Sequence, residues 1–363
     1  MRGEVDPQSS MFHYFSVESR IPVDHPLRRV KKLAESALSA ISAELDGLYA
    51  RTGRPSIPPE RLLKAQLLIA FYSVRSDRLF CEQLDYNLLF RWFLDLDLES
   101  GGLDQSNFSR LRERLVETDI ARRFFDEVVR LARKDKLLSS DHFTVDGTLI
   151  DAWASFKSFK RKDDDEPPKP GDGTGMVDFK GEKRSNATHQ STTDPDAKLM
   201  RKGNGQPAKL SYGGHALMEN RSGLCVDLLI TDATLAEHQA ARQLLTRARR
   251  RKIHPKTLGA DKGYHVKDFV QHLREHKIKP HIARIDGRKT PGLDGRTTCT
   301  EGYKVSQRKR KRVEEIFGWL KTVGGMRKTR FIGEARTQIA AYLSAAAYNL
   351  LRIAKLQSAG SAA

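Results

Sequence analysis

The pattern of apolar and polar residues in the N-terminal third of the chain is that of helices. The segment Ile57-Pro58-Pro59-Glu60 starts a helix, because proline is tolerated in a first helical turn, and apolar residues continue it to about Val74. Helices are predicted over residues 57–74, 76–93, 104–115 and 118–131. These short helices indicate a bundle. The Gly101-Gly102 break before a basic helix permits a helix-turn-helix without requiring one.

The pattern changes to that of an α/β unit after Asp141. Residues 142–150 are β-branched and alternating, which predicts a strand. From Phe156 to about Ala208 the chain is rich in Lys, Asp, Gly, Pro and Ser, which predicts a polar insertion too poor in apolar residues to pack alone. Further strands are predicted over 209–218, 224–231, 279–283 and from 257 into a turn at 264, and helices over 236–250, 266–276, 307–323 and 337–355.

This order of elements predicts two structural units. An all-α helical domain over residues 1–135 precedes an α/β domain over 136–357, which contains the polar insertion at about 156–208. Residues 358–363 are predicted to be a disordered tail. The length of 363 residues agrees with this division, since single cores rarely exceed about 250–300 residues.

Charge and cysteine content narrow the class of protein. The net charge is +18, from 64 Lys and Arg against 46 Asp and Glu, which favours nucleic acid as a partner over an anionic membrane surface or a merely soluble basic protein. No apolar stretch reaches the roughly 20 residues of a membrane span, and the N-terminus lacks a signal region. Three scattered cysteines fit a reducing cytoplasm.

Three carboxylates occupy places where an acid is costly. Asp146 lies inside the first predicted strand, Asp261 at the end of a later strand, and Glu314 on a helix in a basic stretch. Such acids are stable when paired or metal-bound, and converging carboxylates are the ligands that Mg²⁺ prefers. Asp141 and Asp151 lie an odd number of residues from Asp146, so they face the other side of a regular strand. Ordinary salt-bridged or capping acids remain an equal alternative.

Helix geometry distinguishes Glu314 from Glu315. The buried face of this helix is formed by Val313, Ile316, Phe317 and Leu320. At about 100° per residue, Glu314 borders that face and Glu315 points away from it. Arg310 and Lys321 share the stripe of Glu314, an arrangement that suits a metal ligand with phosphate-binding neighbours.

From Arg54 to Lys355 the chain resembles the DDE transposases of bacterial insertion sequences, specifically the insertion-sequence-5 type. The resemblance rests on Arg54-Pro-Ser-Ile-Pro-Pro-Glu-Arg-Leu-Leu63, Arg91-Trp-Phe-Leu94, Ser106-Asn-Phe-Ser-Arg110, Thr144-Val-Asp-Gly-Thr-Leu-Ile-Asp-Ala-Trp-Ala-Ser155, Thr192-Thr-Asp-Pro-Asp-Ala197, Gly259-Ala-Asp-Lys-Gly-Tyr264 and Arg312-Val-Glu-Glu-Ile-Phe-Gly-Trp-Leu-Lys321. It implies an RNase H-like catalytic domain, a mixed sheet with flanking helices, after the all-α domain. It also implies that Asp146, Asp261 and Glu314 are catalytic and ligate metal. Position 307 holds Gln where the family has Tyr.

The resemblance implies a DNA transposase that cuts transposon ends and transfers the 3′-OH into target DNA. Its cofactor would be two Mg²⁺ ions, for which Mn²⁺ can substitute. Its partners would be terminal inverted repeats and target DNA, with a homodimer or larger active complex, no membrane, and a cytoplasmic, nucleoid-associated location in a bacterium. The helical domain would bind DNA ends, mediate dimer contacts or both. A Mg²⁺-dependent structure-specific nuclease and a non-catalytic sequence-specific DNA-binding protein are the alternatives.

Basic residues near the predicted site are candidates for holding the DNA backbone, a role favoured here over a solvated face. The DNA-binding candidates are Lys262, Arg308, Arg310, Arg312, Lys321, Arg327, Lys328 and Arg330. For Trp153, core packing is favoured over stacking on a flipped base.

Overall fold

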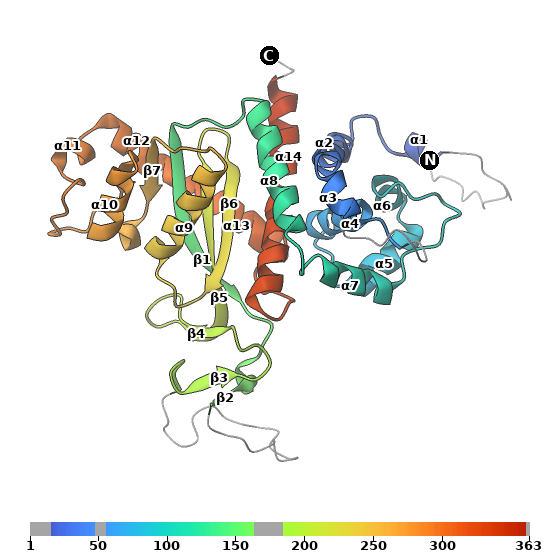
Figure 1. The fold of residues 1–363 in the computed structure, drawn as a ribbon, viewed down its shortest axis with the longest axis horizontal. Helices are drawn as coiled ribbons and strands as arrows, with labels where there is room; N and C mark the ends of the chain where they lie inside the picture. Colours follow the sequence, from blue (N-terminus) through green and yellow to red (C-terminus); the bar gives the residue numbers. More distant parts are fainter. Residues whose placement is uncertain (1–15, 48–55, 163–183, 361–363) are drawn as a thin grey trace, which may run out of the picture.

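A computed structural model describes residues 16–47, 56–162 and 184–360 of the chain. Figure 1 shows a twisted sheet on one side, a group of helices on the other, and two long helices between them. None of the helices in these residues is long and apolar enough to cross a membrane.

The described part of the chain before the sheet is helical. Its helices are α1 (Val17–Arg20), α2 (Pro26–Ala40), α3 (Ser42–Asp46), α4 (Pro59–Phe71), α5 (Asp77–Tyr86), α6 (Leu88–Phe93), α7 (Gln105–Arg114) and α8 (Ile120–Lys134). The helix predicted over 76–93 divides at Asn87, whose side chain accepts a hydrogen bond from the Phe90 amide at 3.1 Å and caps α6. Helices α1 to α3 were not predicted from the sequence.

The sheet is mixed, as predicted. Its strands are β1 (His142–Asp151), β4 (Lys198–Met200), β5 (Lys209–Glu219), β6 (Leu224–Asp232), β7 (Thr257–Ala260) and β8 (Lys279–Ile282). The order is β4-β5-β1-β7-β8, with β6 also paired to β5. β5 is antiparallel to β1 and β6, whereas β7 is parallel to β1 and β8. This arrangement is consistent with the RNase H-like fold that the resemblance implies.

Helices and short 3-10 turns connect and cover the strands. They are α9 (Glu237–Arg250), η2 (Lys262–Tyr264), α10 (Lys267–Glu275), α11 (Gly295–Thr298), α12 (Glu301–Lys309), η3 (Arg310–Arg312), α13 (Val313–Thr322) and α14 (Glu334–Gly360). The helix predicted over 307–323 is interrupted, because η3 separates α12 from α13. α14 is longer than predicted and extends to Gly360, inside the predicted tail.

α14 joins the helical part to the sheet. It packs against α2, α4 and α8 on one side and β6 on the other, and Figure 1 shows it between the two. Its small residues Ala341, Ala345, Ala346 and Ala347 are buried, which allows the close approach that the alanine-rich pattern predicts. The buried apolar residues form one cluster from Ile21 to Ala354. The domain division between residues 135 and 136 stays a prediction.

The ends of the predicted insertion are structured. η1 (Phe156–Ser158) leads into β2 (Phe159–Arg161), which pairs with β3 (His189–Ser191), while the middle of the insertion lies outside the described residues. Beyond β3, the fully buried Asp194 accepts hydrogen bonds from the Tyr212 hydroxyl at 2.6 Å and the Gly333 amide at 3.2 Å. This acid therefore ties the insertion to β5 and to the start of α14.

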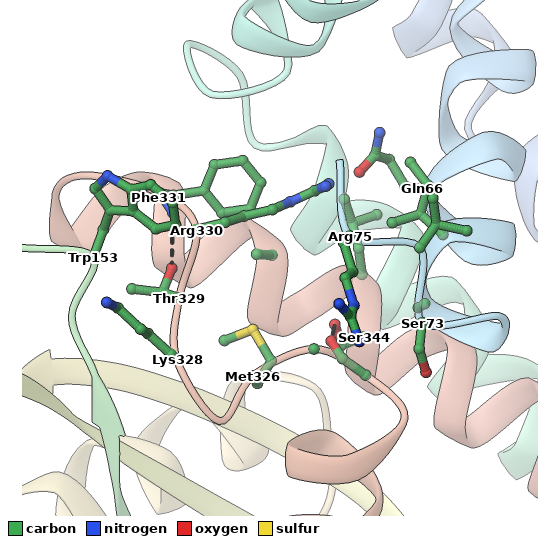
Figure 2. A pocket seen from close by; sticks show the side chains of 17 residues that line it. Gln66, Ser73, Arg75, Trp153, Met326, Lys328, Thr329, Arg330, Phe331 and Ser344 are labelled. Atoms are coloured by element: carbon green, nitrogen blue, oxygen red, sulfur yellow. Dashed lines mark hydrogen bonds between the residues drawn. The ribbon is translucent and has the colours of Figure 1, made fainter. Parts of the chain in front are cut away.

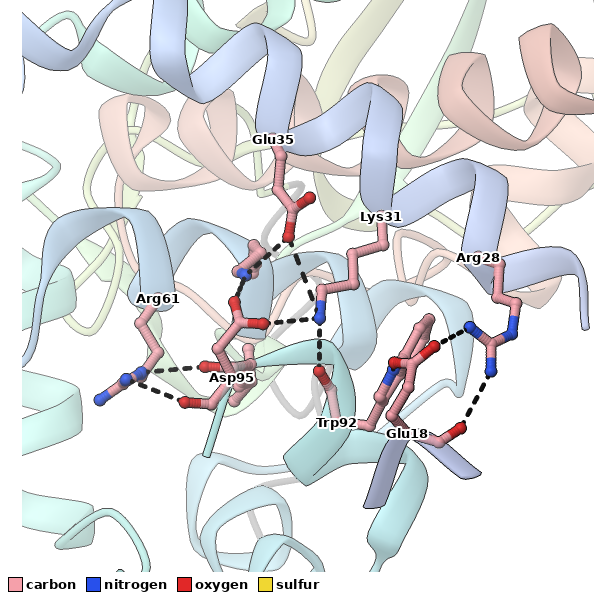
Figure 3. A network of polar contacts seen from close by, with 9 residues as sticks. Glu18, Arg28, Lys31, Glu35, Arg61, Trp92 and Asp95 are labelled. Atoms are coloured by element: carbon pink, nitrogen blue, oxygen red, sulfur yellow. Dashed lines mark hydrogen bonds and ion pairs between the residues drawn. The ribbon is translucent and has the colours of Figure 1, made fainter. Parts of the chain in front are cut away.

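A network of ion pairs holds the helical part together (Figure 3). Lys31 of α2 and the buried Lys64 of α4 both bind the carboxylate of Asp95, Lys31 at 2.6 Å. Lys31 also donates to the Trp92 carbonyl at 2.7 Å, and Glu35 lies 3.5 Å from the Lys64 ammonium. A buried ammonium is costly unless it is paired, and both Asp95 and Glu35 pair with the buried Lys64.

Candidate active site

The parallel register of two neighbouring strands places Asp146 beside Asp261. β1 and β7 pair through Thr144 and Gly259, and each aspartate lies two residues beyond its member of that pair. Adjacent strands lie about 4.8 Å apart, and residues two apart share a face. Asp261 has extended backbone angles (φ −78°, ψ −174°), so it continues the line of β7 before η2 begins.

A glycine brings the third carboxylate to the same place. A Cβ on Gly259 would lie 3.2 Å from the Arg310 Cβ and 3.3 Å from both the Ser306 and Thr144 hydroxyls, so the η3 turn packs directly on the backbone of β7. Glu314 follows one turn after Arg310 on α13, which also contacts β1. The close approach at Gly259 therefore sets where Glu314 stands relative to β1.

The pKa of Asp146 reflects the charges around it. Burial, the largest cause, together with the charges of Asp261 and Glu314, raises this pKa to about 6, against the opposing effects of the Gly147 amide and Arg310. The Gly147 amide donates to the Asp146 carboxylate at 2.9 Å. The structure thus brings Asp146, Asp261, Glu314 and Arg310 into one electrostatic neighbourhood.

Within the described parts of the chain, the three carboxylates differ from their rivals in forming no ion pair. The rivals are paired: Asp141 with Lys256 at 2.8 Å, Asp151 with Lys209 at 2.7 Å, and Glu315 with Arg312 at 3.4 Å. Asp146, Asp261 and Glu314 form no ion pair with any described residue. The salt-bridge alternative therefore finds no support among the described residues, whereas Asp261 does cap η2 through the Gly263 amide. The metal-ligand role of the three acids stays a prediction.

The donor chemistry of the site fits a hard divalent cation. Every candidate ligand is a carboxylate oxygen, the donor that Mg²⁺ prefers. As the side chains stand, no three His, Cys, Asp or Glu within the described ranges enclose an ion. Asp146 and Asp261 instead accept from the amides of Gly147 and Gly263, the latter at 2.8 Å. If Asp146 and Asp261 moved to bind an ion, they would lose these amide hydrogen bonds but would break no ion pair with a described residue.

Three residues that border this site were not predicted from the sequence. Glu237, the first residue of α9, has its pKa raised to about 7 by burial and by the charges of Asp261 and Asp146. Tyr264 is fully buried, and its hydroxyl has no hydrogen-bond partner in the described chain. His215 on β5 lies opposite Gly147, and burial lowers its pKa to about 4. Nothing in the local pattern distinguishes these residues from other acids and core aromatics.

Some of the predicted DNA-binding cations are engaged within the protein. Lys321 donates to the Thr148 hydroxyl at 2.6 Å, on the face of β1 that carries Asp146. Three arginines are also engaged. Arg310 donates to the Gln307 side chain at 3.0 Å, and Arg312 donates to the carbonyls of Asn220 and Arg221 at 2.7 and 2.9 Å. Arg330 forms an ion pair with Asp77 at 3.3 Å. The remaining candidates, Lys262, Arg308, Arg327 and Lys328, are exposed. DNA contact by any of the eight stays a prediction.

Trp153 is not a core residue, contrary to expectation. Its side chain is 52% exposed, and the Lys328 ammonium lies 5.4 Å from the centre of its ring. Figure 2 shows it at a cavity of about 320 Å³, with Arg75 and Arg330 among the other lining residues. The cavity lies between α4, α14 and the loop after α13. Trp153 reaches it because it follows the end of β1, beyond the carboxylates.

Comparison with protein families finds two transposase models along the chain. The transposase DDE domain matches residues 179–350, and the transposase domain DUF772 matches residues 15–114. These matches support a DDE transposase. Asp261 and Glu314 lie within the DDE domain match, whereas Asp146 precedes it. DDE transposases generally use divalent metal ions, in agreement with the donor chemistry described above.

Comparison with solved structures finds transposases at low similarity. A piggyBac transposase synaptic complex with hairpin DNA aligns at a TM-score of 0.44 and 12% identity, covering 93% of this chain and 76% of that one. A Mos1 transposase paired-end complex with the left transposon end aligns at a TM-score of 0.21 and 12% identity, covering 76% of this chain and 81% of that one. Comparison with curated proteins found no match.

Proposed function

We propose that the chain is a DNA transposase of the insertion-sequence-5 type, which cuts transposon ends and joins the 3′-OH to target DNA. The observation that carries the proposal is that Asp261 and Glu314 act on the charge of Asp146 while none of the three forms an ion pair with a described residue, in a strongly basic chain. The two transposase family matches support the same class of reaction on DNA.

In this proposal each site residue has a distinct task. Asp146 and Asp261, side by side on β1 and after β7, would hold two Mg²⁺ ions, and Glu314 would complete the second site. When bound, such ions activate the attacking oxygen and stabilise the leaving oxygen of a phosphodiester. Arg310 of η3 and Lys321 of α13 flank the carboxylates and would hold phosphate oxygens while negative charge develops.

Exposed cations would hold the DNA backbone leading to the site. Lys262 follows Asp261 directly, Arg308 precedes η3, and Arg327 and Lys328 lie in the loop after α13. Each would form a phosphate contact, which adds affinity without reading sequence. Terminal inverted repeats and target DNA are the proposed partners, in a homodimer or larger complex.

The test is an end-joining assay with a labelled transposon-end duplex, a target plasmid and Mg²⁺. Wild-type protein should form joined product, and Asp146→Asn, Asp261→Asn and Glu314→Gln should each abolish it. Glu315→Gln is the matched control, because Glu315 is adjacent on the same helix but is paired with Arg312. Joining that survives in any of the three site variants contradicts the assignment. Cutting without joining would indicate a nuclease, and Mg²⁺-independent binding alone a regulator.

A further inference from the structure

Glu237 lies over the face of the sheet to which Gly147 points, opposite the face that carries Asp146, and next to the turn that follows β7. It is the first residue of α9, which packs against β1, β5 and β6 and also contacts η2. The N-cap residue of α9, Ala236, offers no side-chain cap. The packing of α9 therefore aims its first carboxylate at the space between β1 and the turn that follows β7.

Two glycines show where the Glu237 carboxylate lies. A Cβ on Gly147 would be 2.8 Å from Glu237 Oε1, and a Cβ on Gly263 would be 3.3 Å from Glu237 Oε2. Gly147 and Gly263 are the residues whose amides donate to Asp146 and Asp261. The same Cβ on Gly263 would lie 3.1 Å from Asp261 Oδ1. Glu237 therefore spans from the backbone beside Asp146 to the carboxylate of Asp261.

The Glu237 carboxylate has no compensating partner. No described residue donates a hydrogen bond or an ion pair to it, although it is half-buried between two other acids. A carboxylate in this setting is destabilising unless a cation joins it. A role limited to the helix dipole does not explain the burial, since Asp268 provides the same charge in the first turn of α10 while exposed.

Two buried polar atoms face this space and lack protein partners. The Tyr264 hydroxyl is unpartnered, and the charges of Glu237, Asp146 and Asp261 all act on it. The His215 side chain is only 3% exposed, and its Nε2 is hydrogen-bonded to the Thr231 hydroxyl at 3.1 Å. Its unpartnered Nδ1 would lie 3.1 Å from a Cβ on Gly147. The Thr231 hydroxyl donates to the Asp232 carbonyl and therefore accepts from His215 Nε2, which leaves Nδ1 as an acceptor. Buried polar atoms without a partner are costly, and ion-bound water is the kind of ligand that would satisfy them.

We propose that Glu237 is a fourth carboxylate of the divalent-metal site, with Tyr264 and His215 holding ion-bound water beside it. The inference rests on the proposed function only in taking Asp146 and Asp261 as metal ligands. Two divalent cations carry four positive charges. With Glu237, four carboxylates instead of three are available to balance these charges before DNA binds. Glu237 is thus a metal ligand supplied by α9, an element outside the three motifs.

The test measures binding of Mn²⁺ alone to the full chain, by the electron paramagnetic resonance signal of free Mn²⁺, together with thermal unfolding. Glu237→Gln should weaken Mn²⁺ binding by about tenfold or more. It should also shrink the rise in melting temperature that Mn²⁺ produces, and leave the melting temperature without metal unchanged or higher. The control Asp268→Asn should change none of these quantities.

A second variant tests the same site without changing its charge. Gly147→Ala places a methyl group against Glu237 Oε1 and should weaken Mn²⁺ binding too, whereas Gly318→Ala, which meets open space, should not. Mn²⁺ affinity of Glu237→Gln within twofold of wild type, while Asp146→Asn loses binding, would overturn the role of Glu237 alone. Wild-type binding that is absent, or unaffected by Asp146→Asn, would instead overturn the metal site of the proposed function and this inference with it.

Discussion

The acids of the helical part and those of the carboxylate site differ in their partners. Asp95 forms ion pairs with two lysines, one of them buried (Figure 3), whereas Asp146, Asp261 and Glu314 form no ion pair with a described residue. The sheet does not lack cations for its other acids, because the buried Asp227 on β6 is paired with Arg251 at 2.7 Å. Paired acids stabilise the fold. Among the acids without an ion pair, the buried Asp194 is satisfied by hydrogen bonds from Tyr212 and Gly333, and the site acids are those proposed to bind metal.

The largest expected effect comes from neutralising an unpaired acid. Asp146→Asn should reduce end joining by about 10³-fold or more, since metal stabilisation of the transition state is worth several kcal/mol. Its melting temperature without metal should be unchanged or higher, because the substitution removes no ion pair. Measured loss of stability comparable to that of Asp95→Asn would break the contrast between the two regions.

Neutralising a paired acid should lower the stability of the fold and leave end joining unchanged. Asp95→Asn should lower the free energy of unfolding by about 1 kcal/mol, a modest value because the Asp95 side chain is 54% exposed. Asn suits the backbone here, since Asp95 has a φ of 53° and Asn tolerates the left-handed region. Urea unfolding measures the change, end joining should stay within twofold of wild type, and Asp97→Asn, which breaks no ion pair, is the control.

The stability supplied by Asp95 should also depend on pH. Burial opposes ionisation of this carboxyl, but its bonds to Lys31 and Lys64 prevail and hold its pKa below the ordinary 3.8. A lowered pKa in the folded state means that the stabilisation is complete above pH 3.8 and is lost as pH falls through the folded value. The difference between wild type and Asp95→Asn should therefore shrink below about pH 4 in urea titrations. A difference that stays constant down to pH 3 would contradict the pairing.

The smallest effect is expected for an exposed cation. Arg308→Gln should leave stability within about 0.5 kcal/mol of wild type and reduce the slope of log affinity for DNA against log salt by about 0.9. Arg312→Gln should instead destabilise the fold by about 1–2 kcal/mol, because it loses two carbonyl partners at the β5–β6 turn. Equal salt slopes for wild type and Arg308→Gln would remove Arg308 from the proposed DNA surface.

Much of the local structure was predictable because it depends on short-range patterns. The proline-led start of α4, the Asp104 cap of α7 and the strand that carries Asp146 are written in runs of a few residues. The break at Asn87 and the division of α12 from α13 were missed, since the apolar periodicity continues through both. The exposure of Trp153 was also missed, because burial depends on distant elements.

The sequence by itself determined which acids are unusual, namely one inside a strand, one at a strand end and one at the edge of a helix face. Only the tertiary structure decided that Thr144 pairs with Gly259, which aligns Asp146 with Asp261, and that α9 aims Glu237 at the same space. The reason is physical. Periodicity is set by neighbours along the chain, whereas register and convergence are set by packing between elements that no local pattern connects.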